Sequence, residues 1–165
     1  MRTSTITRTH RLFAAGAVAA LALFGPPQIH VRAATAGAPG VPAGAALLVE
    51  VRHHDDHGGV TVTGRAEGMK GGKRVTQPLT LTGTGKGAYA LTRQWAVGSP
   101  WVLVLSAEQV EGGSHGLSEA LVKVDSRGAI VSIEHPRGSI VAKGAAVDRI
   151  GEKDVSAALA SLSHR

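Results

Sequence analysis

The sequence contains no cysteine, and this absence excludes several kinds of chemistry. Without thiols the chain has no disulfide, no cysteine zinc site, no catalytic cysteine and no attachment point for a cysteine-linked lipid. Small exported domains often rely on disulfides for stability. A domain of this kind without them has to be stabilised by its core, by a metal or by a partner.

Aromatic residues are also scarce, at 3% of the chain. Both phenylalanines lie in the first 36 residues, and the remaining three aromatics, Tyr89, Trp95 and Trp101, follow one another closely. Two interpretations are open for these three: they fill a small core, or they form a stacking platform for a sugar or a peptide. Because large aromatic side chains dominate small cores by area, the core interpretation is favoured.

The first 36 residues contain no acidic residue. Three arginines precede an apolar run, Leu12 to Phe24, and small residues follow it. Val31-Arg32-Ala33 and Ala34-Thr35-Ala36 are candidate cleavage boxes. This order of segments predicts a signal peptide over residues 1–36 and a periplasmic or secreted protein. The alternatives are an uncleaved anchor or a buried helix, but the run is shorter than the roughly 20 residues that a spanning helix needs. We therefore expect no membrane span after cleavage.

Removing the leader changes the charge of the protein. The whole chain has 18 basic and 12 acidic residues, and four of the arginines lie in residues 1–36. The remainder then carries a formal net charge of +2 instead of +6. A nearly neutral domain gives no electrostatic reason to expect binding to nucleic acid.

The rest of the chain indicates one β-rich domain. Residues 37–46 are small and include two prolines, so they are expected to form a flexible entry arm. Segments of alternating apolar residues, separated by glycine-rich turns, then predict about seven short strands; they centre on residues 47–51, 60–65, 79–82, 89–95, 101–105, 119–124 and 129–134. The short gaps favour antiparallel pairing. We expect an all-β, antiparallel, immunoglobulin-like β-sandwich over residues 47–143.

Two segments have distinctive patterns. Residues 101–105 (WVLVL) are apolar on both faces, which predicts a central strand. In the C-terminal extension, residues 144–165, Asp154 is expected to cap a short helix from Val155 to Leu162. The apolar stripe of this extension should dock on the sandwich. The stripe consists of Ile150, Val155, Leu159 and Leu162.

A histidine-rich stretch is the candidate metal site. It runs from His53 to His57 between two predicted strands, and the proposed ligands are His53, His54, Asp56 and His57. Imidazole and carboxylate ligands suit copper or zinc. His115 and His135 are further candidates if the loops converge. The alternative is a solvated hairpin loop, because five consecutive ligand-type residues cannot all face one ion.

Two other sequence patterns do not meet the requirements of the catalytic or binding motifs that they suggest. Residues 112–116 fit the spacing of a nucleophile elbow, G-x-S-x-G, but the next segment alternates as a strand where that motif requires a helix. Residues 68–74 lack the spacing of a phosphate-binding loop. Two interpretations are open for the nearby cations Lys70, Lys73, Arg74 and Lys86: a modest basic patch, or turn and edge-strand charges that discourage edge pairing, which is the favoured one. No pair of carboxylates is recognisable as catalytic, so no enzymatic activity is expected.

Part of the domain resembles a known type of module. The relevant segments are Val62 to Ala66, Leu79 to Leu81, Gly87 to Leu91 and Gly98 to Leu103. They are similar to the exported immunoglobulin- or transthyretin-like modules of bacteria, of the carboxypeptidase regulatory-like or FixH/YtkA-like kind. The resemblance implies a β-sandwich that binds or scaffolds, and it supplies no functional residues.

These observations predict an exported, non-enzymatic binding or structural module of the cell envelope, with an envelope or extracellular protein as partner. The alternative is a periplasmic copper- or zinc-binding protein that uses the His53–His57 loop. Apart from that metal, no cofactor is expected.

Overall fold

The computed structural model describes residues 27–52, 59–111, 114–135, 139–142 and 149–163. These residues form ten strands and one helix: β1 (Gln28–Ala33), β2 (Ala45–Arg52), β3 (Val60–Lys70), β4 (Lys73–Pro78), β5 (Thr82–Gly85), β6 (Ala88–Thr92), β7 (Trp101–Glu111), β8 (Ser114–Val124), β9 (Ile130–Glu134), β10 (Ser139–Ala142) and α2 (Glu152–Ser163).

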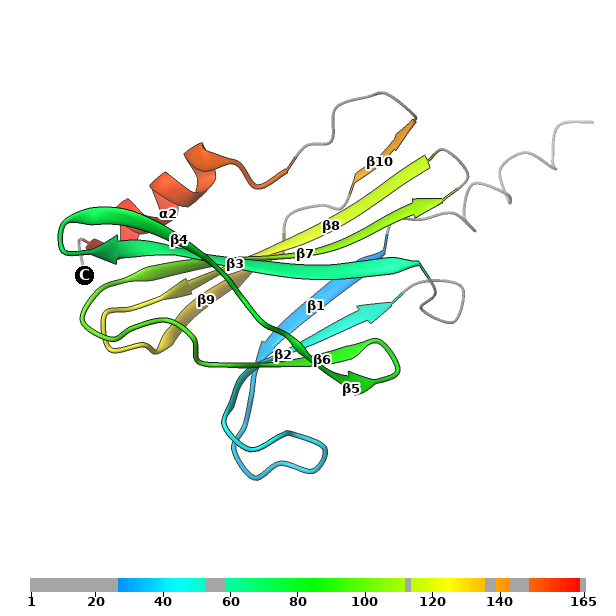
Figure 1. Ribbon diagram of the computed structural model, residues 1–165, viewed down its shortest axis with the longest axis horizontal. Helices are drawn as coiled ribbons and strands as arrows, with labels where there is room; N and C mark the ends of the chain where they lie inside the picture. Colours follow the sequence, from blue (N-terminus) through cyan, green and yellow to red (C-terminus); the bar gives the residue numbers. More distant parts are fainter. Residues whose placement is uncertain (1–26, 53–58, 112–113, 136–138, 143–148, 164–165) are drawn as a thin grey trace, which may run out of the picture.

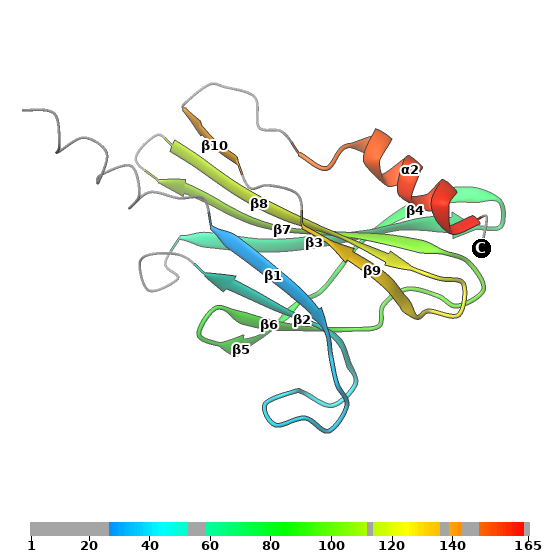
Figure 2. The ribbon, with the colours of Figure 1, turned by 180° about the vertical axis from the view of Figure 1, so that it is seen from behind.

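The strands form two antiparallel sheets, and the predicted all-β sandwich is confirmed (Figure 1). The four-stranded sheet has the order β1-β2-β6-β5. The six-stranded sheet has the order β10-β8-β7-β3-β4, and β9 also pairs with β8. Seen from behind, β1 lies between its sheet partner β2 and the strands of the larger sheet (Figure 2).

The core between the sheets follows from alternation along each strand. Leu47, Val49 and Val51 of β2 face Leu103 and Leu105 of β7 in one buried cluster. Both tryptophans belong to this cluster, and each is less than 5% exposed. The core interpretation of the tryptophans is therefore confirmed, and the half-buried Tyr89 packs against the same cluster.

The outer face of the six-stranded sheet is covered by α2. Val102 and Val104 of the central strand β7 point to this face, as the two-sided apolar pattern predicts. Ile150, Val155, Leu159 and Leu162 are buried against them, so the docking stripe is confirmed. Within the described ranges, no helix is long and apolar enough to cross a membrane.

The first strand was not expected. Residues 28–33 fall inside the predicted leader, yet they pair with β2 along their whole length. The expected entry arm, residues 37–46, consequently forms the loop of the β1–β2 hairpin and the start of β2. Backbone hydrogen bonds order this loop, among them Ala38 N–H to Thr35 O and Val41 N–H to Ala38 O.

Two further expectations were wrong. Residues 79–81 are not a strand. They connect β4 of one sheet to β5 of the other, and Leu79 is buried at this crossing, where its N–H donates to Gly64 O.

Asp154 is not the residue that caps α2 from outside. The helix begins at Glu152, and Asp154 in its first turn accepts a hydrogen bond from Gly151 N–H (2.8 Å).

Candidate functional site

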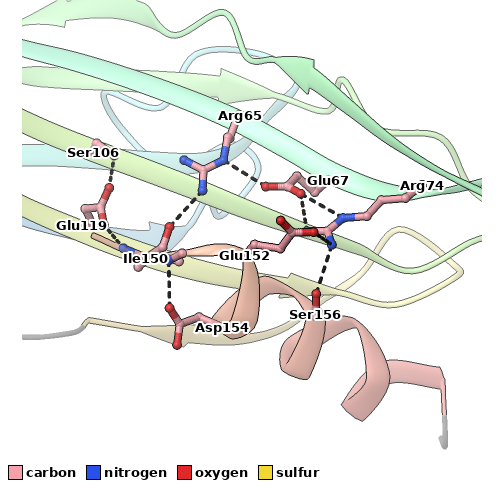
Figure 3. A network of polar contacts seen from close by, with 10 residues as sticks. Arg65, Glu67, Arg74, Ser106, Glu119, Ile150, Glu152, Asp154 and Ser156 are labelled. Atoms are coloured by element: carbon pink, nitrogen blue, oxygen red, sulfur yellow. Dashed lines mark hydrogen bonds and ion pairs between the residues drawn. The ribbon is translucent and has the colours of Figure 1, made fainter. Parts of the chain in front are cut away.

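Among the described residues, an extensive polar cluster lies between the six-stranded sheet and α2 (Figure 3). At one side of it is Glu67 of β3, which is 7% exposed. Arg65 Nε donates to one carboxylate oxygen at 3.0 Å, and Arg74 Nη2 donates to the other at 2.6 Å. Burial alone would raise the pKa of Glu67, but hydrogen bonds and charge from the two arginines outweigh it and lower the pKa below 4.5.

The second buried carboxylate is Glu119 of β8, which is 5% exposed. Ser106 Oγ on the paired strand β7 donates to it at 2.8 Å, and the backbone N–H of Ile150 donates to its other oxygen. Arg65 Nη2 donates to the carbonyl of the same Ile150 at 3.1 Å. Both backbone groups of Ile150 are therefore held by side chains of the sheet.

The cluster continues onto the helix through Arg74. Its Nη1 donates to Glu152 at 3.1 Å and to Ser156 Oγ at 3.0 Å, both on α2. Each carboxylate oxygen of Glu67 and Glu119 accepts a hydrogen bond from within the protein. Leaving a buried carboxylate without its partners is costly, so Glu119 disfavours arrangements that displace the N–H of Ile150. We conclude that this cluster fixes the position of α2 on the sheet.

Part of this cluster carries a signal in the sequence. The Gly71-Gly72 turn closes a β-hairpin in which Met69 pairs with Arg74 and Glu67 pairs with Thr76. This register places Arg74 diagonally opposite Glu67, within reach of a long side chain. The contact between Glu119 and Ile150 has no such signal, because it joins distant segments through the docking of α2.

A second polar contact lies along β1. Ile29 N–H donates to Ser118 Oγ of β8 at 3.3 Å, and Val31 N–H donates to His135 Nε2 at 3.0 Å. The rings of His30 and His135 are 6.4 Å apart. Burial of the ring and the charge of His30 both lower the pKa of His135. The contact needs a neutral His135, because a proton on Nε2 would remove the acceptor for Val31 N–H.

A hollow of about 490 Å³ lies between the β8–β9 turn and the end of α2. Ile130, Val131 and Leu162 give it an apolar side, and Asp125 and Arg127 give it a polar side. These two charged groups bond to each other at 2.9 Å. Hydrogen bonds from the Ala129 backbone and from Arg127 lower the pKa of Asp125. The charge of the hollow is thus neutralised locally.

The predicted metal ligands His53, His54, Asp56 and His57 lie outside the described residues. Within the part of the chain that is described, no group of three or more His, Asp or Glu side chains could hold a metal ion. The first two residues of the G-x-S-x-G pattern, 112 and 113, also lie outside the description, whereas residues 114–116 form the start of strand β8, where that motif has a sharp turn into a helix. Lys73 and Arg74 stand on the edge strand β4, as interpreted from the sequence.

Comparison of the chain with models of protein families, with curated proteins and with solved structures gave no match.

Proposed function

We propose that the protein is an exported, non-enzymatic β-sandwich that acts as a binding or structural module in the cell envelope. Export rests on the signal-type sequence of the first residues. The structural role of the polar cluster agrees with this proposal, because Glu67 and Glu119 are occupied in holding α2 rather than presented to solvent.

The observation that carries the proposal is the β1–β2 loop, residues 34–44, which projects from the sandwich in both ribbon views (Figures 1 and 2). The loop contains no charged residue and two prolines. Its turns are closed by backbone hydrogen bonds, including Ala45 N–H to Pro42 O at 3.2 Å. A preordered loop loses little conformational entropy on binding. Its uncharged surface suits a protein partner better than an ion or a nucleic acid.

The experiment shortens this loop and keeps all the residues through which β1 and β2 pair. Ala34 N–H donates to Ala46 O, so these two residues continue the β1–β2 register as a hydrogen-bonded pair. A two-residue turn requires such a pair on its flanks, so an Asn-Gly turn in place of residues 35–45 would close the hairpin in the same register. The matched control is Lys153→Ala on the exposed side of α2.

The assay is chemical cross-linking in intact cells that naturally make the protein, followed by purification and mass spectrometry. We expect cross-links to an envelope or extracellular protein from the wild type and from Lys153→Ala, and their loss from the shortened variant. If the wild type forms no specific cross-link, the binding proposal is refuted. Cross-links that survive loop shortening would refute the role of the loop.

A second function, copper or zinc binding through His53, His54, Asp56 and His57, is favoured by the strand register. The stretch that carries these residues leaves β2 at Arg52, which pairs with Gln28 of β1. His30 lies two residues along β1 from that point and His135 lies beside it. The register thus brings two further imidazoles toward the strand end from which the candidate ligands follow.

Calorimetric titration tests this second function. Wild type should take up Cu(II) or Zn(II) stoichiometrically, and a variant with alanine at positions 53, 54 and 57 should not. The single change His164→Ala, at the far end of the chain, is the control and should titrate as wild type. Equal titrations of wild type and the triple variant would exclude metal binding at this stretch.

A further inference from the structure

Strand β1 is built into the core of the domain. Ile29 and Val31 are 4% and 6% exposed and belong to the buried cluster between the sheets. Pro27, directly before the strand, is fully buried. All six residues of β1 pair with β2, from Gln28 opposite Arg52 to Ala33 opposite Leu47. Removal of β1 would therefore expose core residues and leave β2 without its outer neighbour.

The strand also joins the two sheets. It is hydrogen-bonded to β2 in the four-stranded sheet, and its other edge faces β8 and β9 of the six-stranded sheet. Ser118 and His135 accept the N–H groups of Ile29 and Val31 on that edge. An unpaired strand edge is a site for unwanted pairing with other chains. Here the edge is closed by side chains of the opposite sheet.

Both cleavage boxes considered from the sequence conflict with this arrangement. Cleavage after Ala33 or after Ala36 would remove all of β1. Either position would also make a leader longer than the 15–30 residues typical of signal peptides. An earlier box, Ala20-Leu21-Ala22, has the required small residues and would release a leader of ordinary length.

We propose that the exported chain is cleaved after Ala22, so that the mature protein begins at Leu23 and keeps β1 as its first strand. This inference rests on the export proposal. The reaction is hydrolysis of the peptide bond between Ala22 and Leu23: water adds across it, giving a new carboxylate on the leader and a new amino terminus on the domain.

The first experiment identifies the amino terminus of the exported protein. The full chain with a C-terminal tag is expressed in a bacterium with a general secretory pathway, and the product outside the cytoplasm is examined by N-terminal sequencing and intact mass. We expect a chain that begins at Leu23. The variant Ala22→Leu should accumulate as the uncleaved precursor, whereas Ala33→Leu should be processed as wild type.

An amino terminus at Ala34 or Gly37 would overturn the inference while leaving export intact. A wild-type chain that stays uncleaved in the cytoplasm would overturn the export proposal and the cleavage site together. The place of β1 in the domain is then read separately, by comparing urea unfolding of chains that begin at Leu23 and at Gly37. We expect a cooperative transition for the former and its loss, or a large shift to lower urea, for the latter. Identical transitions would show that β1 is dispensable.

Discussion

Gly68 provides a sharp test of the packing around Trp101. The two residues are directly opposite each other in the antiparallel pair β3–β7. A Cβ atom at position 68 would lie 2.5 Å from Trp101 Cδ2 and 2.6 Å from Cε3. These distances are far below van der Waals contact, so Gly68→Ala must displace the indole ring, the backbone of β3, or both.

The cost can be worked out from the surroundings of the ring. Overpacking a filled core usually costs about 1–3 kcal/mol. Trp101 is 3% exposed, and its Nε1–H donates to Ala96 O at 2.9 Å. A ring displacement that breaks this hydrogen bond would add about 1 kcal/mol. Alanine is more favourable than glycine in a strand by about 0.5–1 kcal/mol, which offsets part of this cost. We therefore expect Gly68→Ala to lower the free energy of unfolding by about 1–3.5 kcal/mol.

The assay is urea unfolding followed by tryptophan fluorescence and circular dichroism. The matched control is Gly83→Ala in β5, where a Cβ would meet nothing within 4 Å. Since glycine in a strand is less favourable than alanine by about 0.5–1 kcal/mol, the control should be unchanged or slightly more stable. The double variant Gly68→Ala/Trp101→Leu isolates the contact, because the alanine should cost much less once the ring is gone. Equal costs with and without the ring would refute the reasoning.

Three further predictions concern protonation and an unpartnered donor. The pKa of His135 is lowered in the folded protein, so its contribution to the free energy of unfolding is fully present above about pH 6.5. This contribution is lost as the pH falls from there toward the folded pKa. His135→Gln should therefore reduce the dependence of the melting temperature on pH in this range. The pKa of Glu67 also lies below its usual value, so a second loss should follow as the pH falls below 4.5 through the folded pKa, and Glu67→Gln should remove it. Trp95 Nε1 is buried and has no hydrogen-bond partner among the described atoms. Trp95→Phe should therefore be milder in urea unfolding than Trp101→Phe, which loses the bond to Ala96 O.

Patterns that act locally along the chain predicted much of the fold. The two-sided apolar run from residue 101 to 105 is a central strand because one face packs in the sandwich and the other under α2. The stripe on the C-terminal helix was predictable for the same reason, since a helix buries one periodic face. Each of these signals lies within a single element and needs no knowledge of its neighbours.

The expectations that missed the structure concern stretches whose sequence pattern fits two different interpretations. Residues 28–33 alternate as a strand, with Ile29 and Val31 inward, but they begin only three residues after the apolar run and end in small residues that suit a cleavage box. Residues 79–81 also alternate, yet Leu79 and Leu81 contact the core while crossing between sheets. Alternation reports which side chains are buried. It does not report whether the backbone pairs with a neighbour.

In the candidate site, too, some contacts follow from local strand register and others depend on how distant segments pack. Glu67 and Arg74 are joined by a tight hairpin, so their contact follows from register. Glu119 and Ile150 are joined only by docking of the helix, and the histidine-rich stretch remains a prediction.

Strand β1 and the residue that precedes α2 are held by neighbouring residues of β8. Successive side chains of β8 point to opposite faces. Ser118 points inward and accepts the N–H of Ile29 on β1, while Glu119 points outward and accepts the N–H of Ile150 before α2. Because β8 is paired along its length with β7, a change at the Ile29 contact or at the Ile150 contact affects the same pair of strands. Loss of β1 should therefore lower protection of the Ile150 amide in hydrogen exchange, although the two elements lie on opposite faces of the sheet. Unchanged protection of Ile150 in a chain without β1 would show that the β1 contact and the Ile150 contact are independent of each other.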